Sequence, residues 1–520
     1  MIQQPQHFAT LNGKIITAAV CLISLFLFQS VSFIFSKSLT WDETKYLGVG
    51  KHLLDSESWT PGPARDHPPL SFYLSSMGMA GLELNEPVEP SNPVERGKHL
   101  LHQHGDTLIY RARLPMLVLG CILGISLFLW SYELYGNAGS LVTLSLFSIS
   151  PNLIAHQSLI TPDFALTTFF FTTAWCFYRS IISGRYLWFL ALGVSTGFLL
   201  LSKFTSLFVL PISLLWLITI YRQRSEPFLY DRFWLKISTS AFVSIIIVCI
   251  AYRFQLNLIY DGIAFQYQTS RSPWPAYFLG IVRQKPVLAY FTTTILLKLP
   301  IPLLVLTACS QLATPRLQHH AHQLTRTIAF CFLLFFVAYF SFFSHLNIGF
   351  RYLLPMVPFL ILISGQCLFI SKSSRLKAVT IGLLLLGQAA SILYAGWSQP
   401  GGPHYLSYFN ELSGGPSNGY LFLADSNLDW GQDLKGLKRY IDQHPQEQFL
   451  ILYWGSMPLD FYGLRPSKLP SPEKAPTNVL VAISTTRLLG IYEEDPIVYR
   501  WLLQKPTIAR IGYSIHIFRL

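Results

Sequence analysis

The chain has 520 residues, of which 51% are apolar, 15% aromatic and 12% charged, and its formal net charge is +12. A soluble chain of this length would divide into several cores with about 25% charged residues, and a disordered chain would contain few aromatic residues. Both classes are excluded, and the composition indicates an integral membrane protein. The basic residues lie beside apolar segments, so the positive charge reflects membrane topology and not nucleic-acid binding.

Eleven apolar segments are long enough to cross a bilayer, which takes about 17–25 residues of helix. The first is followed directly by Lys37 and lacks a small-residue cleavage site, so we expect a retained helix and not a signal peptide. The prolines of ILLKLPIP are expected to break a later span near Lys298. The expected spans are 15–35, 114–132, 139–156, 163–181, 186–202, 204–221, 236–253, 288–310, 327–344, 352–370 and 378–396.

Basic residues also predict the orientation of the chain. With a cytoplasmic N-terminus, 12 Lys and Arg residues near the span ends fall on the inner side, against three acidic residues, as the positive-inside rule requires. An odd number of spans then leaves two large polar regions outside, the loop of about 37–113 and the tail of about 397–520. No Asn-x-Ser/Thr sequon occurs in the chain, which favours the plasma (inner) membrane of a bacterium.

The sequence therefore divides into a transmembrane domain, 1–396, and an extracytoplasmic domain, 397–520, joined by the linker SQPGGPH. The tail alternates short β-rich runs with helical patterns, which is typical of a small α/β domain. The β-rich runs are 419–425, 449–455, 478–484 and 509–518, and the helical patterns are 430–441 and 495–505.

Two acids open the first outer loop. Asp42 and Glu43 in WDETKYL lie only a few residues beyond the first span. One interpretation is a helix start, with Asp42 as N-cap and an acidic first turn. The other is a general base at the membrane surface, where a lipid-borne substrate would present its head group. The residues themselves leave both interpretations open.

A second pair of polar residues follows in DHPPLSFYL. Asp66 and His67 precede Pro68 and Pro69, and proline is favoured at the first position of a helix. The N–H groups of a helix N-terminus bind anions, and His67 would add a donor. Asp66 as a simple helix cap is the alternative.

Further ionisable residues lie at the outer ends of other spans. Asp163 begins the fourth span, Lys203 occupies the turn of the hairpin 186–221, and His345 and Arg351 precede the tenth span. An N-terminal acid near a helix dipole and a snorkelling lysine are the alternatives for the first two. Together, carboxylates and cations converge on one membrane face, and such cations suit an anionic head group.

These motifs resemble a known group of enzymes. WDETKYL followed by DHPPLSFYL is similar to the acidic first-loop motif and the (E/D)-x-PPL element of polyprenyl-phosphate-sugar-dependent glycosyltransferases of the GT-C superfamily. That superfamily includes protein O-mannosyltransferases and lipid A aminoarabinose transferases. The stretches YFTTTILLKLPIPLL, SHLNIGFRYLLPMVPFL and YLSYFNELSGGPSNGYLFLADSNLDWGQDLKGLKRYI also resemble bacterial members, so the similarity covers nearly the whole chain. It implies a polytopic α-helical membrane protein of GT-C type with about 11 spans and a C-terminal extracytoplasmic α/β domain.

The resemblance also implies roles for individual residues. The catalytic base carries over to Asp42, with Glu43 as the adjacent candidate, and the second acidic position carries over to Asp66. His67 replaces the lysine that often binds the carrier phosphate, so we expect Lys203 or Arg351 to supply that contact. Some relatives hold a divalent metal with an acid and a histidine in outer loops. Because no matching histidine occurs in 254–287, the metal is left open.

The expected reaction is an inverting transfer of a hexose or pentose at the outer membrane face. The donor would be an undecaprenyl-phosphate-linked monosaccharide, and the acceptor a glycan, lipid or protein. The alternatives are a transporter or flippase of lipid-linked sugars and a glycan-binding scaffold without catalysis. Transporters usually show internal repeats and midplane ionisable groups, whereas the acids here cluster at outer ends.

The predicted topology can be tested by cysteine labelling from outside in a background without the seven native cysteines. A membrane-impermeant thiol reagent should reach positions near 60 and 440 but not positions near 228 or 374. The reverse labelling pattern would contradict the orientation and the placement of the site.

Overall fold

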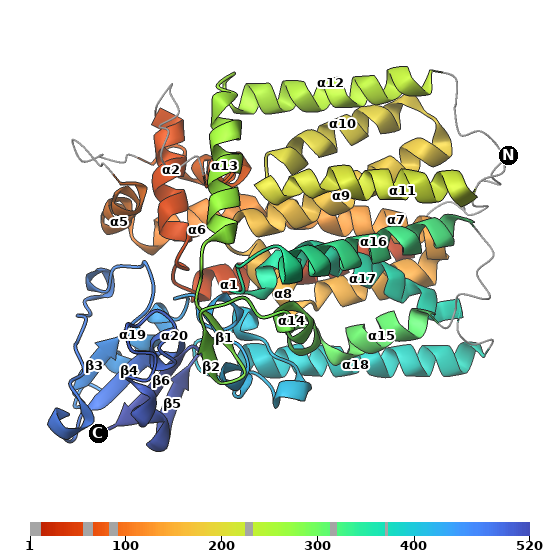
Figure 1. The fold of residues 1–520 in the computed structure, drawn as a ribbon. Coiled ribbons are helices and arrows are strands. Elements are labelled where there is room, and N and C mark those ends of the chain that lie inside the picture. Colours follow the sequence, from red (N-terminus) through yellow and green to blue (C-terminus); the bar gives the residue numbers. More distant parts are fainter. Residues whose placement is uncertain (1–11, 56–65, 83–91, 224–231, 312–319, 370–372) are drawn as a thin grey trace.

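In the computed structural model of the chain, most helices run side by side in one bundle (Figure 1). The first-loop helices and the C-terminal sheet gather at the same end of that bundle, which we call the outer end. The structure describes residues 12–55, 66–82, 92–223, 232–311, 320–369 and 373–520.

Within the described ranges, six helices are long and apolar enough to cross a membrane, or seven if the bent pair α14 and α15 forms one span. The prediction of a polytopic helical membrane protein is confirmed, and the count of eleven spans stays a prediction. The main helices of the bundle are α1 (Gly13–Ser36), α7 (Leu117–Ser148), α9 (Pro162–Ser183), α10 (Tyr186–Leu200), α11 (Val209–Gln223), α12 (Phe233–Ala251), α14 (Tyr290–Lys298), α15 (Ile301–Ser310), α16 (His320–Phe342), α17 (Val357–Ser364) and α18 (Ser374–Trp397).

Helix α7 reverses direction at Gly136, the one residue inside it with a non-helical backbone, φ 68° and ψ −162°. In a straight helix, Gly124 and Phe147 would lie about 35 Å apart at 1.5 Å per residue. A Cβ built on Gly124 would instead lie 3.2 Å from the Phe147 ring. The two halves of α7 therefore pack against each other, as the separate predicted spans 114–132 and 139–156 require.

The expected break at Lys298 is also present. Helices α14 and α15 meet at an angle of 106°, with Pro300 between them, and proline cannot continue the hydrogen-bond pattern of the first helix. The buried Lys298 ammonium donates to the carbonyls of Leu406 at 3.0 Å and Asn427 at 2.5 Å. The break thus ties a membrane helix to the segment that follows the last span.

The outer end is built from short helices and turns. They are α2 (Glu43–Asp55), α4 (Leu70–Met79), α5 (Pro93–His104), α6 (Asp106–Arg113), η1 (Leu114–Met116), α8 (Pro151–Gln157), η2 (Phe204–Phe208), α13 (Asn257–Arg271), the hairpin β1 (Ala276–Phe278) and β2 (Ile281–Arg283), and η4 (Phe350–Met356). The turn η5 (Gly365–Phe369) lies at the opposite end, where Gly365 packs against Tyr135 next to the reversal of α7.

The tail forms the predicted small α/β domain. Its four-stranded sheet has the order β3-β4-β6-β5, with β3 and β4 parallel and the other pairs antiparallel. Three of the four β-rich runs are strands, and 509–518 divides into the hairpin β5 and β6. Its elements are η6 (Tyr405–Ser407), η7 (Glu411–Ser413), η8 (Gly419–Leu421), η9 (Asp425–Asn427), α19 (Leu434–Asp442), β3 (Phe449–Leu452), η10 (Asp460–Tyr462), η11 (Pro472–Lys474), β4 (Leu480–Ser484), α20 (Thr485–Leu488), η12 (Arg500–Gln504), β5 (Thr507–Ile511) and β6 (Ile515–Arg519).

Two predicted elements of the tail are wrong. The run 419–425 is not a strand: it turns through η8, makes one bridge from Leu423 to Phe278, and packs Gly419 onto the Phe409 ring. The pattern 495–505 is not an α-helix but ends in the 3₁₀ turn η12. There the Asp495 carboxylate accepts from the amide of Ile497 at 3.1 Å, a local bond that favours a turn over a helix.

Much of the segment between α18 and α19 is buried from Pro403 onward, whereas the start of the predicted linker, 398–402, is exposed or half-buried. Tyr405, Phe409, Leu423 and Trp430 belong to the same apolar core as the membrane helices. The domain division at 396/397 stays a prediction, and these contacts favour a boundary near the start of α19.

A buried ion pair fastens this segment to the end of α1. The Lys37 ammonium donates to Asp433 Oδ1 at 2.6 Å and lies 2.5 Å from His404 Nδ1. Ser514 donates to the second carboxylate oxygen at 2.6 Å. Burial raises the pKa of Asp433, but Lys37 and His404 outweigh that effect and bring it to about 2. The carboxylate is therefore ionised at neutral pH.

We expect Asp433→Asn to lower the melting temperature of the detergent-solubilised protein. Loss of one partner leaves the Lys37 charge buried without its counter-ion, which typically costs about 3–5 kcal/mol. Asp442→Asn is the matched control, because that carboxylate pairs with Lys438 on the exposed surface of the same region and should change stability little. Equal melting temperatures for the two variants would contradict the role given to Asp433.

Candidate functional site

A cavity of about 200 Å³ opens at the outer end of the bundle. Five of the eight residues predicted for the site line it, although they come from five separate segments of the chain. They are Asp42 before α2, His67 before α4, Asp163 in the first turn of α9, Lys203 before η2 and Arg351 in η4.

Two ion pairs organise the charges of the cavity. Arg351 Nη1 donates to Asp42 Oδ2 at 2.7 Å, and Lys203 Nζ donates to Asp163 Oδ1 at 2.7 Å. Aromatic faces hold both cations: the Arg351 guanidinium carbon lies 4.4 Å from the Trp430 ring centre, and Lys203 Nζ lies 4.7 Å from that of Tyr352. Such contacts fix a cation without neutralising it.

The two acids differ in access to water. The side chain of Asp42 is 30% exposed, whereas that of Asp163 is 1% exposed. Asp42 directly precedes α2, but its carboxylate reaches across the cavity mouth to Arg351. Asp42 is therefore the acid of the cavity that an incoming molecule can touch.

Four residues of the cavity wall retain a buried polar atom without a hydrogen-bond partner within the described part of the chain. These atoms are His67 Nδ1, Asp163 Oδ2, Thr205 Oγ1 and Arg351 Nε. Buried polar groups are nearly always paired, so an unpaired cluster suggests a place for a polar ligand or ordered water.

His67 is a neutral imidazole in this setting. Burial lowers its pKa well below the usual 6.5, and the nearby charges of Lys203 and Lys45 lower it further. Lys45 itself is paired with Asp66, whose backbone carbonyl accepts from Gln266 at 2.6 Å. Asp66 is not among the residues that line the cavity, so only His67 of this predicted pair belongs to the cavity wall.

Glu43 is fully buried and bonded on both oxygens. Arg113 donates to Oε1 at 2.9 Å and to Oε2 at 2.6 Å. The amide of Ile160 donates to Oε1 at 2.9 Å, and that of Thr40 donates to Oε2 at 2.8 Å. This carboxylate joins the first loop to α6 and to the segment before α9. Glu43 is not among the residues that line the cavity.

The structure does not bring His345 into the cavity wall. Its neighbours Ser344 and Leu346 line the cavity, whereas the backbone amide of His345 donates to the Ser270 carbonyl at 2.9 Å. Residues 343–349 form an irregular turn, and the sequence could not show which of its side chains face inward.

Two residues near the site, Arg113 and Trp430, were not predicted from the sequence. Arg113 is the last residue of the predicted outer loop 37–113, and nothing in the sequence marks it as the partner of Glu43. Trp430 and Asp425 lie in the tail, far from Arg351 in the sequence, and only tertiary folding brings them near it. Burial raises the pKa of Asp425 to about 6, against the lowering effects of a hydrogen bond from Tyr492 and the charge of Arg351.

The described residues contain no group of three or more His, Cys, Asp or Glu side chains that could hold a metal ion. Three polar residues that lie close together in the tail, Asp425, Asn427 and Asp429, bind separate protein partners and not one shared centre. These partners include Tyr492, Tyr290 and the Thr486 amide, respectively.

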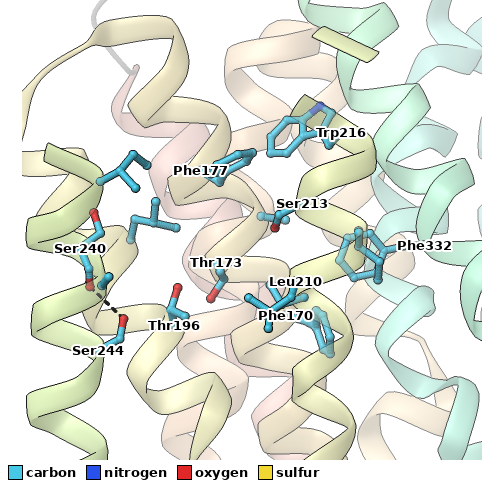
Figure 2. Close-up of a pocket in the computed structure, with 16 residues that line it drawn as sticks. Phe170, Thr173, Phe177, Thr196, Leu210, Ser213, Trp216, Ser240, Ser244 and Phe332 are labelled. Carbon is cyan, nitrogen blue, oxygen red and sulfur yellow. Dashed lines mark hydrogen bonds between the residues drawn. The ribbon is translucent and has the colours of Figure 1, made fainter. Parts of the chain in front are cut away.

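A second cavity, of about 230 Å³, lies deeper in the bundle between α9, α10, α11, α12 and α16. Figure 2 shows its wall, with Phe177 and Trp216 on one side and Ser240 and Ser244 on another helix. Apart from a few hydroxyl groups its lining is apolar. It is lined by Phe170, Thr173, Ala174, Phe177, Leu192, Thr196, Val209, Leu210, Ile212, Ser213, Trp216, Ile237, Ser240, Ala241, Ser244 and Phe332.

Aromatic side chains connect the two cavities. Phe208, which lines the charged cavity, lies with its ring centre 5.8 Å from that of Phe336. Phe336 in turn lies 5.6 Å from Phe170 of the apolar cavity. A continuous apolar seam therefore runs from the charged outer end into the membrane bundle.

Glu43 and Arg113 should behave as a structural pair. Arg113→Met leaves the Glu43 charge buried without its main partner, so we expect a loss of about 3–5 kcal/mol, measured as a lower melting temperature in detergent. Adding Glu43→Met should recover part of that loss, because the double variant carries no unpaired charge. Lys98→Met, which removes an exposed partner of Glu95 in α5, is the control. An Arg113→Met protein as stable as the unmodified chain would contradict the assignment.

Comparisons with known proteins agree with the fold. Residues 104–252 match the family model described as dolichyl-phosphate-mannose-protein mannosyltransferase. Two crystal structures of ArnT from Cupriavidus metallidurans, one bound to undecaprenyl phosphate and one in the apo state, each align over 96% of this chain and 97% of theirs. Their TM-score is 0.52 at 12% sequence identity, a likeness of fold. The sequence matches none of the curated proteins. The resemblance to GT-C glycosyltransferases, and with it the multi-pass membrane fold, is confirmed.

Proposed function

We propose that this chain, which has the fold of GT-C glycosyltransferases, transfers a monosaccharide from a polyprenyl-phosphate carrier to an acceptor at the outer membrane face, with inversion. One observation carries the proposal: the buried Lys203, the partly buried Arg351 and one accessible carboxylate share a single cavity at the outer end of the bundle. The crystal structure of ArnT, which has the same fold, is bound to undecaprenyl phosphate.

Lys203 and Arg351 would bind the carrier phosphate. Charge-assisted hydrogen bonds from lysine and arginine to phosphate are among the strongest in proteins. Arg351 still has its unpaired Nε, and Lys203 donates to one oxygen of Asp163. As the bond between the anomeric carbon and the phosphate oxygen breaks, negative charge grows on that oxygen, and both cations stabilise it.

Asp42 would act as the general base. The acceptor hydroxyl attacks the anomeric carbon from the face opposite the phosphate, and Asp42 takes its proton, so one glycosidic bond forms as the sugar–phosphate bond breaks. Its 30% exposure makes it accessible to an acceptor, and Arg351 orients its carboxylate. Glu43, which was the adjacent candidate, would serve as a positioning residue, because Arg113, Thr40 and Ile160 occupy its oxygens.

The apolar cavity gives the lipid tail a place to lie. A polyprenyl chain must remain in an apolar environment while its head group reaches the charged cavity. The packed rings of Phe208, Phe336 and Phe170 make the region between the two cavities apolar, as a lipid tail that lies there would require. Two further predicted residues, Asp66 and His345, lie outside the cavity lining and would not contact the donor. Asp66 pairs with Lys45, and the His345 amide donates to the Ser270 carbonyl.

The site favours an enzyme over a flippase. The charged residues of the cavity lie at one end of the bundle, at the starts of α2, α9, η2 and η4. A transporter would instead be expected to place ionisable groups near the midplane.

Asp42→Asn should reduce sugar transfer by about 10²- to 10⁴-fold, because the amide keeps the size of the side chain but accepts no proton. The measurement is the release of undecaprenyl phosphate from an undecaprenyl-phosphate sugar by the purified protein. Asp460→Asn, at an exposed carboxylate of the outer domain, should leave that rate unchanged. Near-normal release by Asp42→Asn would show that the first-loop acid is not the base.

Lys203→Met should weaken binding of undecaprenyl phosphate to the purified protein by at least about tenfold, since a charge-assisted hydrogen bond is worth roughly 1.5–3 kcal/mol. Arg283→Ala is the control, because Arg283 is an exposed cation on the same face. Equal affinity of the two variants would place the phosphate elsewhere.

A further inference from the structure

Three aromatic rings form a stack beside the charged cavity. The Trp41 and Trp454 rings lie 4.9 Å apart at an interplanar angle of 15°, and Trp454 and Tyr492 lie 5.6 Å apart at 5°. Trp41 belongs to the first loop, Trp454 follows β3, and Tyr492 follows α20. The stack is thus assembled from the membrane domain and the C-terminal domain together.

The outer rings of the stack are held firmly but remain exposed. Trp41 is 45% and Tyr492 is 39% exposed. The backbone amide of Trp41 donates to the Trp430 carbonyl at 2.9 Å, and the Tyr492 hydroxyl donates to the Asp425 carboxylate. Both outer rings therefore keep surface that a ligand can contact.

The position of Trp41 indicates which molecule would use this surface. Trp41 directly precedes Asp42, yet it does not line the charged cavity. The exposed Trp41 ring thus lies outside the cavity, next in the chain to the one acid of the site that is open to water, whereas the lipid-linked donor would fill the cavity itself. Asp42 must reach a hydroxyl of the acceptor, so the stack flanks the path of the acceptor.

We propose that the outer rings of the stack, Trp41 and Tyr492, with Trp454 packed between them, form an acceptor subsite that binds a pyranose ring of a glycan; this inference rests on the proposed function. One face of a pyranose presents C–H groups, which pack on an aromatic ring, while its hydroxyls point outward to water and polar groups. Tryptophan and tyrosine lose little conformational entropy on binding, which suits them to such contacts. The acceptor would then be a carbohydrate, or a lipid or protein that already carries one.

The inference is tested with the full-length protein in nanodiscs and two neutral oligosaccharides, maltotriose and N,N′-diacetylchitobiose. Saturation-transfer difference NMR should show transfer to the ring C–H protons of at least one sugar. Trp41→Ala should lower its affinity by about two- to tenfold, since aromatic stacking is worth roughly 0.5–1.5 kcal/mol. Trp41→Phe should retain most of the binding.

The matched control is Trp234→Ala, because Trp234 is also highly exposed but lies at the start of α12, away from the site. Binding that is absent for both sugars, or equal in Trp41→Ala and Trp234→Ala, would overturn the subsite. Melting temperatures of all three variants show whether a loss of binding reflects unfolding, and a folded Trp41→Ala with intact sugar binding also overturns it.

Release of undecaprenyl phosphate from the donor in water, measured on the same samples, separates the two proposals. Release without sugar binding would leave the proposed function standing and refute the subsite. Sugar binding without release would refute the proposed function and, with it, the acceptor role of the stack.

Discussion

The placement of charge at one end of an apolar bundle is the constraint on which the rest of this structure depends. A charge buried in a low-dielectric interior is tolerated only when it is paired and hydrogen-bonded. The Glu43–Arg113 and Lys37–Asp433 pairs meet this requirement between segments far apart in the sequence. The pairs therefore fix the first loop, the tail and the span ends relative to one another.

Against this background of satisfied charges, the cavity between Asp42 and Arg351 stands out. Arg351 is paired with the exposed Asp42 but keeps an unpaired Nε, and one oxygen of Asp163 is also unpaired. The fold thus separates two uses of charge. Fully bonded pairs hold the outer end together, and incompletely bonded groups line the cavity where an anionic ligand would be stabilised.

Sequence reasoning predicted the membrane class and the α/β tail, because these follow from hydropathy and from strand and helix patterns. It also named five residues that line one cavity, because ionisable residues at span ends are conspicuous. It could not separate Asp42 from Glu43, since the distinction depends on Arg113, 70 residues later in the chain. It did not predict that much of 405–434 is buried. The apolar residues of this segment fit a strand pattern, but in the structure they pack onto membrane helices. It also placed His345 with Arg351, although only tertiary packing decides which side chain of that turn faces the cavity.

The central claim is that the cavity beside Asp42 holds the phosphate of a polyprenyl carrier. The most direct measurement is a cryo-electron microscopy map of the protein in nanodiscs with undecaprenyl phosphate. The account predicts density for the phosphate within hydrogen-bond distance of Lys203 and Arg351, with the lipid tail entering along Phe208 toward the apolar cavity. Density for the phosphate at another place, with this cavity empty, would contradict it.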